Sequence, residues 1–388
     1  MPKTLKIVLW FLIMLGFVFG FAGLVFPGQS PIVEILPPDT YQFQRLHIFL
    51  FNLVSGGTVL LFFTQGRQKL SRLVGVFMLG SIIFSVSVFL NHYLLASFLA
   101  VGLALAVEVV RVQRFSFFPR DFFDSKVPVA RKFHQAALLC LSLGLLIAAF
   151  VMLDNQYFHW INQPALNVDD FFLGFSFPIS LLTFSVMFSL AKEDTDKRIR
   201  FLRELSFWVI NLGVIIFFVF IILQIFAMQI IVAFLLFFDV LLVFFLFKYD
   251  SQPMEQLNFL ISGIYFLIMT SITGILLTLE ETYLPSLDPH SWAILLQIHA
   301  YLSIYGWNLS GLTVIMRYKE FPLHLHNLEI ILIHWLVISL LAPLGSLYAP
   351  FAIIAIPVFA ILIGLILFDR GHQDFFQQTS HIQVNNIT

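Results

Sequence analysis

The chain has 388 residues, of which 60% are hydrophobic and only 11% are charged, and its mean hydropathy is +0.94. This composition excludes an ordinary soluble globular domain and indicates a polytopic membrane protein. The net charge of −1 gives no sign of a nucleic-acid partner, and the single cysteine, Cys140, excludes an intrachain disulfide.

Twelve apolar stretches of about 18 to 25 residues follow one another along the chain, each long enough to cross a hydrocarbon core of ~30 Å as a helix. They lie near 7–27, 42–64, 73–90, 92–110, 134–153, 170–191, 205–226, 228–247, 257–279, 291–316, 328–347 and 350–368. The first follows a basic start, as in a signal peptide. It is longer than a typical signal h-region and lacks a small-x-small cleavage site, so we expect a retained anchor. The predicted architecture is an all-α bundle of about 12 transmembrane helices, with one domain over 1–370 and a polar cytoplasmic tail over 371–388.

The basic residues sort to one side of this threading. Of the 21 Lys and Arg residues, all except Arg45 lie in segments that share one face of the membrane when the stretches alternate in direction. The opposite loops carry acids, among them Glu34, Asp154 and Glu280. Under the positive-inside rule both termini are cytoplasmic and the number of spans is even. We expect a multi-pass protein of a bacterial inner (plasma) membrane, in contact with the lipid bilayer.

Two histidines lie inside apolar stretches at one predicted depth. His47 and His299 are each roughly two turns from the outer face, on stretches that run inward. Glycines follow after two to three turns, at Gly56, Gly57 and Gly306, where another helix or a flat cofactor can approach the backbone. Such a pair suits axial ligation of a haem iron, although two buried histidines are, taken alone, more often structural.

Other polar groups lie at membrane depth. Asp239 is near the middle of 228–247, and no stretch places a basic residue at its depth. Such a carboxyl is either protonated and hydrogen-bonded or part of a proton or cation path, and the sequence leaves both open. His334, beside Trp335, is better explained by an interhelical hydrogen bond than by metal ligation.

The surroundings of His47 and His299 resemble those of a known family. Short motifs carry the resemblance: Leu46-His47 with Gly56-Gly57 after it, and His299-Ala-Tyr301 with Gly306-Trp307 and Pro322 after it. The first resembles helix two, and the second helix ten, of haem–copper oxidase subunit I, most closely the cbb type and the related nitric-oxide reductases. The resemblance implies a subunit-I-like bundle in which His47 ligates a low-spin haem and His299 a high-spin haem.

Departures from that family remove its copper centre. The second histidine of helix ten is Tyr301 here, and Phe175 stands near the place of the copper-ligating histidine of helix six. The consecutive histidine pair of helix seven is absent from 205–226. Without imidazole ligands we expect no copper, and hence no dioxygen reduction by the family's binuclear mechanism.

The placement of a haem has more than one solution. Positions 299 and 301 are about 200° apart around an α-helix, so they cannot serve the same haem face. In one arrangement His47 lies opposite Tyr301, which ligates ferric haem as a phenolate, and His299 faces a second site. In another, a small register change brings His299 opposite His47 as a bis-histidine pair. In a third, both places are filled by phenylalanine, of which the chain has 48.

The expected function is that of a haem-bearing subunit, with haem b and no copper. It would transfer electrons or bind a small gas such as NO or O2, beside cytochrome or other respiratory subunits; we assign no catalytic residue. The alternatives are a twelve-span secondary transporter and a cofactor-free scaffold that holds partner subunits. Transporters show broken helices in matching halves, whereas Pro178, Pro343 and Pro350 form no such match.

Overall fold

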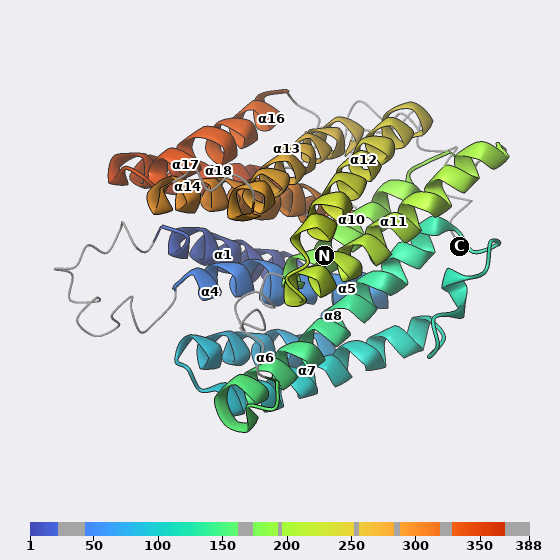
Figure 1. Ribbon diagram of the computed structural model, residues 1–388, viewed down its shortest axis with the longest axis horizontal. Coiled ribbons are helices and arrows are strands. Elements are labelled where there is room, and N and C mark those ends of the chain that lie inside the picture. The colour runs from blue at the N-terminus through green and yellow to red at the C-terminus, as the bar shows by residue number, and fades with distance from the viewer. Residues whose placement is uncertain are drawn as a thin grey trace.

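The structure is a computed structural model that describes residues 1–21, 43–161, 174–192, 196–251, 256–282, 288–318 and 328–368. Within these ranges the chain forms helices joined by turns and no β-sheet, which confirms the all-α prediction. The longer helices lie roughly along one common direction (Figure 1).

The helical elements follow one another without long structured insertions. In chain order they are α1 Lys3–Phe19, α4 Phe43–Ile48, η1 Phe49–Gly57, α5 Thr58–Gln65, α6 Arg72–Phe89, α7 Tyr93–Arg114, η2 Arg120–Phe122, α8 Val129–Leu153, η3 Asp154–Phe158, η4 Gly174–Ser176, α10 Phe177–Ser189, α11 Lys197–Ile222, α12 Phe226–Asp250, α13 Gln256–Thr282, α14 Pro289–Tyr301, η5 Leu302–Asn308, α15 Leu309–Met316, α16 Leu328–Trp335, η7 Leu336–Leu341, α17 Ala342–Gly345 and α18 Ala349–Phe368. The elements η1, η3, η5 and η7 are π-helical, and η2 and η4 are 3₁₀ turns. Because π-helical segments continue directly into α-helices, 43–65, 289–316 and 328–345 are each one unbroken helix.

Nine helical stretches in the described ranges are long and apolar enough to cross a membrane. They are Arg45–Gln65, Arg72–Phe89, Tyr93–Arg114, Val129–Phe158, Lys197–Ile222, Phe226–Asp250, Gln256–Glu280, Leu328–Gly345 and Ala349–Phe368. Each falls on a predicted apolar stretch, which confirms a polytopic membrane protein. Of the other three predicted stretches, 7–27 overlaps α1, 170–191 overlaps the 13-residue helix α10, and 291–316 coincides with the helix over 289–316. Residues 22–27 and 170–173, like the predicted tail 371–388, lie outside the described residues. A total of twelve spans stays a prediction.

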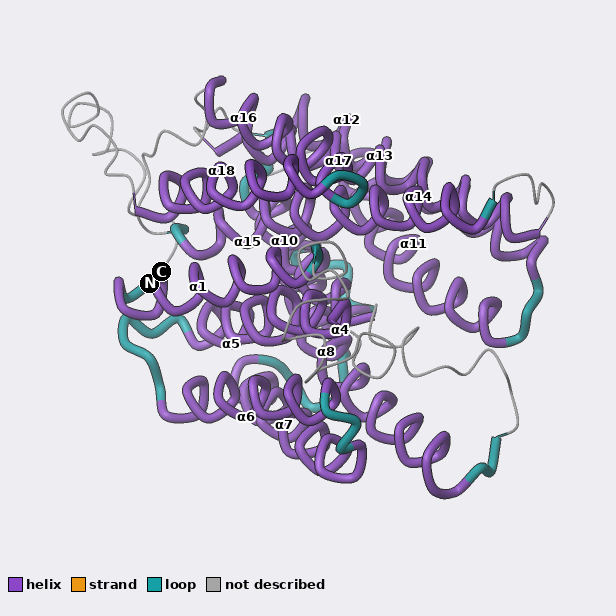
Figure 2. The backbone as a smooth tube through the Cα atoms, turned by 90° about the vertical axis from the view of Figure 1, so that its left-hand side faces the viewer, coloured by secondary structure: helices purple, strands orange, loops and turns teal. Residues whose placement is uncertain are grey.

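The first and last helices of the described chain are neighbours. In Figure 1, α1 and α4 lie between a group formed by α6, α7 and α8 and a group formed by α16, α17 and α18, and Figure 2 shows the same order from the side. Trp10 on α1 donates from Nε1 to the carbonyl oxygen of Ala360 on α18 at 3.2 Å. Helices α11, α12 and α13 pack in sequence, with α11 against α8 and α13 against η5 and α15. The two halves of the chain therefore share one bundle.

Local sequence signals set several helix ends. Ser71 precedes α6 and accepts a hydrogen bond from Val74 N at 3.2 Å, and Asp196 accepts one from Arg198 N at 2.8 Å ahead of α11. Gly66 ends α5 with a φ of 63°, a left-handed conformation that glycine adopts without a Cβ clash. Short polar caps of this kind mark where the apolar spans begin and end.

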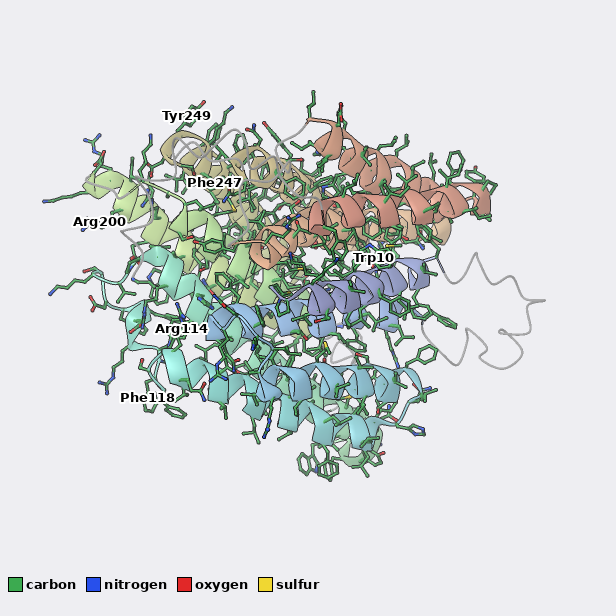
Figure 3. The ribbon with its side chains drawn as sticks, turned by 180° about the vertical axis from the view of Figure 1, so that it is seen from behind. Trp10, Arg114, Phe118, Arg200, Phe247 and Tyr249 are labelled. Carbon is green, nitrogen blue, oxygen red and sulfur yellow. The ribbon has the colours of Figure 1, made fainter. Side chains whose placement is uncertain are left out.

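One end of the bundle collects basic residues. Contacts there join the ends of α5, α7, α8, α11 and α12: Lys132 with Glu204, Arg203 with Asp250, and Arg114 with the carbonyl oxygen of Thr64. Figure 3 shows Arg114 and Arg200 at this same end of the molecule. The ring of Tyr318, next to Arg317, lies 5.5 Å from the ring of Phe63, so α15 ends there too. We call this end the basic end.

Arg45 lies at the opposite end, as its place in the sequence predicts. Its Nη1 donates to Asn91 Oδ1 at 3.3 Å and to Tyr93 Oη at 2.8 Å, in the turn between α6 and α7. The sorting of basic residues to one end is thus confirmed for the residues these contacts connect. That the basic end faces the cytoplasm stays a prediction.

Candidate functional site

Three π-helical segments meet in the centre of the bundle. Asn308 of η5 donates from Nδ2 to Asn52 Oδ1 of η1 at 3.4 Å. The carbonyl oxygen of Tyr305 in η5 accepts from Nε2 of His334, which is on α16 two residues before η7, at 2.7 Å. All four of these polar groups are buried. π-Helical turns are rare and are frequently found at functional sites. The meeting of η1, η5 and η7 therefore marks the centre of the bundle as the candidate site.

His47 is buried beside this centre, on the turn of α4 that leads into η1. Its Nδ1 lies 3.1 Å from the carbonyl oxygen of Gly16 on α1 and 3.0 Å from Tyr305 Oη. One nitrogen cannot serve both as a donor and as an acceptor: either Nδ1–H donates to Gly16, or Tyr305 donates to an unprotonated Nδ1. Only the first tautomer leaves Nε2 with a lone pair for a metal.

Tyr301 packs directly against His47, and the predicted arrangement with a haem between these two residues stays a prediction. Their ring centroids are 6.0 Å apart, and the ring of Phe21 stacks on Tyr301 at 5.6 Å. Gly20 makes this contact possible, because a Cβ there would lie 2.9 Å from His47 Nδ1 and 3.1 Å from Tyr301 Oη. Within the described residues Tyr301 Oη is buried and makes no hydrogen bond. The Nδ1 side of His47 is therefore closed by packed side chains.

His299 faces a different helix. Its Nδ1 lies 3.1 Å from the carbonyl oxygen of Thr270 and 3.1 Å from Thr273 Oγ1, both on α13. A Cβ at Gly274 would lie 3.2 Å from His299 Cε1. Positions 299 and 301 thus lie on opposite sides of α14, as predicted from helix geometry. Among the described residues no contact joins the imidazoles of His47 and His299, which would be separated by the macrocycle in a bis-histidine site, so that arrangement stays a prediction.

The two histidines nevertheless share one feature. In each, Nδ1 is within hydrogen-bond distance of a backbone carbonyl oxygen on a neighbouring helix, Gly16 for His47 and Thr270 for His299. Metal-ligating histidines are commonly held in this way, because the carbonyl fixes the proton on one nitrogen and leaves the other for the metal. The residues therefore fit axial ligation of a haem iron through Nε2.

The glycines that follow the two histidines serve helix packing. A Cβ at Gly306 would lie 2.5 Å from Phe266 Cγ, one at Gly57 would lie 2.9 Å from Phe77 Cε1, and one at Gly56 would overlap Ile179. Of the two roles the sequence leaves open, close approach of another helix is the one these contacts support. The glycine that does face His47 is Gly20, which the sequence pattern did not single out.

Phe175, at the expected copper position, is buried among aromatic rings. Its ring lies 6.0 Å from that of Phe49 and 6.4 Å from that of Phe84. In the part of the chain that the structure describes, no group of three or more His, Cys, Asp or Glu side chains is placed to hold a metal ion. A haem iron needs only one or two protein ligands, so this finding does not bear on His47 or His299.

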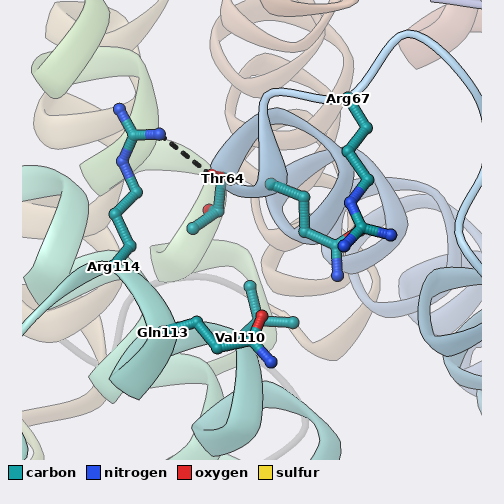
Figure 4. A pocket seen from close by; sticks show the side chains of 6 residues that line it. Thr64, Arg67, Val110, Gln113 and Arg114 are labelled. Atoms are coloured by element: carbon teal, nitrogen blue, oxygen red, sulfur yellow. Dashed lines mark hydrogen bonds between the residues drawn. The ribbon is translucent and has the colours of Figure 1, made fainter.

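A separate polar pocket of about 230 Å³ lies at the basic end (Figure 4). Its lining comes from the ends of α5 and α7 and the turn after α5: Thr64, Gln65, Arg67, Val110, Gln113 and Arg114. The pocket shares no residue with the surroundings of His47 or His299. It is therefore not the candidate haem site.

Sequence reasoning missed Tyr305 and His334 as neighbours of the site. Tyr305 follows Tyr301 by four residues, a spacing that would have placed both on one helix face. The hydrogen bond from His334 to Tyr305 confirms the interhelical role predicted for that histidine. No family model, curated protein or solved structure matches the chain. Any functional assignment therefore rests on the site itself.

Proposed function

We propose that the protein is a multi-pass membrane haem subunit that transfers electrons or binds a small gas such as NO or O2. One observation carries the proposal: His47 and His299, on separate helices, both have Nδ1 on a backbone carbonyl oxygen. That arrangement prepares Nε2 of each as an iron ligand. A bound haem b would supply reversible one-electron chemistry and an open position for a gas.

The surrounding residues hold and shield the ligands. In the ligating tautomer, His47 Nδ1–H donates to the carbonyl oxygen of Gly16 and His299 Nδ1–H donates to that of Thr270. The buried rings of Phe17, Phe21 and Tyr301 exclude water from His47. We infer that Tyr301 packs beside the first haem and is the weaker ligand candidate, because its phenol would have to ionise in a buried place.

The wider setting belongs to the same proposal. Without a histidine at Phe175 the chain has no copper ligand at the usual place, so we do not assign dioxygen reduction to it. A subunit of this kind would act beside cytochrome or other respiratory subunits in a bacterial inner membrane. The resemblance to haem–copper oxidase subunit I supports these statements through the motifs around His47 and His299 alone.

The test is a dithionite-reduced minus oxidised spectrum of the purified, haem-supplemented protein. We expect a b-type α-band that His47→Ala or His299→Ala abolishes or shifts. His134→Ala is the matched control, because His134 is also buried in a span but its Nε2 is already bonded to Thr64 Oγ1 at 2.8 Å. A flat spectrum from well-folded protein would sink the proposal.

Tyr305→Phe separates the two hydrogen-bonding states of His47. Removing the hydroxyl leaves Gly16 as the partner of Nδ1, which favours the tautomer that ligates through Nε2. We therefore expect this variant to keep the α-band at full intensity in the same spectrum. Loss of the band would mean that Tyr305, rather than Gly16, organises the imidazole.

One observation favours secondary transport as a second candidate. Transporters place broken helices from both halves of the chain around a central site. The π-helical segments η1 and η5 come from the two halves and meet through Asn52 and Asn308, so each half brings one widened turn, within a continuous helix, to the centre of the bundle. Uptake of solutes into proteoliposomes by haem-free protein would support this candidate and count against the first.

A further inference from the structure

Asp239 is a buried carboxyl on a helix that carries neither haem candidate. Asp239 is on α12, eleven residues before Asp250, which pairs with Arg203 at the basic end. Eleven residues of α-helix rise by about 16 Å, which is close to half of a hydrocarbon core of ~30 Å. The side chain is only 5% exposed. Asp239 therefore lies near the middle of the membrane.

This carboxyl has one polar neighbour in the described ranges and no ion pair there. Asp239 Oδ2 is buried and makes no hydrogen bond, and no ion pair reaches the side chain. Ser206 on α11 is the polar side chain that faces the carboxyl, and its hydroxyl can satisfy at most one of the two oxygens. A carboxyl with a single hydroxyl as its neighbour is not fixed by the fold. Of the two roles that the sequence leaves open, this geometry favours the proton or cation path.

Asp154 shows what a structural carboxyl looks like in the same protein. It is 1% exposed, and its two oxygens accept from the backbone nitrogens of Trp160 at 2.8 Å and Ile161 at 3.2 Å. Those bonds satisfy a carboxylate and tie it to one turn of chain. Asp239 lacks such bonds although it is buried to a similar degree. The difference between the two points to a group that changes state rather than one that holds the fold.

Charged and titratable groups on the neighbouring helices lie away from Asp239. Those of α11 are at the basic end: Lys197, Arg198, Arg200, Arg203 and Glu204. On α13, Tyr265 packs its ring on Phe244 at 5.2 Å, and the acids Glu280 and Glu281 are at the far end of the helix. A lone carboxylate at this depth is costly, so the neutral acid is the resting form.

We propose that Asp239 is a proton-binding site within the membrane that exchanges with the basic end past Ser206. In the reaction the O–H bond of the carboxylic acid breaks to give a carboxylate and a proton, and the reverse step restores it, with no redox change. Ser206 lies between Asp239 and the basic end. At that end, Lys132 Nζ lies 2.8 Å from both oxygens of Glu204. Glu204 is two residues from Ser206 on α11, a rise of about 3 Å. The exit for the proton is thus short and polar.

The site is independent of the proposed haem function, and its test needs no haem. Dicyclohexylcarbodiimide, which reacts with protonated carboxyls in apolar surroundings, is added to the full chain in detergent, and labelled peptides are identified by mass spectrometry. We expect label on Asp239 at low pH, its loss as the pH rises, and its complete loss in Asp239→Asn. Asp154 in the same protein is the internal control and is expected to stay unlabelled at every pH.

Two further measurements keep the proposal falsifiable. In the first, sodium replaces choline in the labelling reaction at constant pH. Unchanged labelling supports a proton site, whereas protection by sodium would identify a cation site and overturn the proposal.

In the second, infrared spectra of the wild type and Asp239→Asn are compared across pH. A protonated carboxyl band that disappears with rising pH and is missing in the variant supports exchange. A band that persists at every pH, or no difference from the variant, would contradict it.

Discussion

Replacing Glu204 with Gln is expected to lower the free energy of unfolding by about 3–5 kcal/mol. Its partner Lys132 is 1% exposed, and besides Glu204 its Nζ reaches only the carbonyl oxygen of Phe122, at 3.1 Å, among the described residues. Gln keeps the size of the side chain and one acceptor oxygen but removes the compensating charge. The ammonium group would then be buried without a counterion, which costs far more than an exposed ion pair contributes.

The matched control is Asp121→Asn, which breaks an ion pair at the same end of the bundle. Its partner Arg131 is 48% exposed, so water replaces the lost interaction and the expected cost is about 0–1 kcal/mol. Both variants would be unfolded by SDS titration in mixed micelles, followed by tryptophan fluorescence. Equal effects in the two variants would mean that the Lys132–Glu204 pair is hydrated in the protein.

Gly311→Ala is the second substitution with a large expected effect. A Cβ at Gly311 would overlap the side chain of Thr183 on α10, and Thr183 is fully buried with its Oγ1 bonded to the carbonyl oxygen of Ile179 at 2.8 Å. The threonine cannot turn away without losing that bond. We expect a loss of about 1–3 kcal/mol from overpacking, against a gain in helix propensity of up to about 1 kcal/mol.

Gly102→Ala isolates the propensity effect, because a Cβ at Gly102 on α7 would meet nothing within 4 Å. That variant is expected to be neutral or slightly more stable in the same titration. If Gly311→Ala behaved like Gly102→Ala, the contact between α10 and α15 would have to be looser than the structure has it.

The positions of the spans could be predicted because membrane burial leaves a strong record in composition. Runs of apolar residues, and the sorting of every basic residue except Arg45, depend on the bilayer alone and not on which helices touch. The π-helical turns of η1 and η5 leave no such record. Most of their residues are apolar or small, like those of the α-helices around them, and the widened turns follow from packing between helices distant in sequence.

The candidate site could be predicted in its residues but not in its contacts. Depth and helix geometry placed His47 and His299 in the bundle. The angle between positions 299 and 301 placed His299 and Tyr301 on opposite sides of α14. The partners Gly16 and Thr270 contribute backbone carbonyl oxygens, which any residue type carries, so no sequence motif announces them. Tertiary packing decides such contacts, and only the structure reveals them.

The helix over 289–316 is continuous, but the part before η5 and the part after it are rotated relative to one another about the helix axis. We call these two parts its rods. An i→i+5 turn holds one residue more than an i→i+4 turn, so η5 turns Leu309 and all that follows by about 100° relative to a uniform α-helix. Deleting one residue within η5 would remove the offset and leave the depth of both rods nearly unchanged. The rod with Tyr301 could then still meet His47 while the rod with Thr313 turned away from its neighbours. The architecture therefore implies that the fold depends more on the number of residues in η5 than on which side chains they carry.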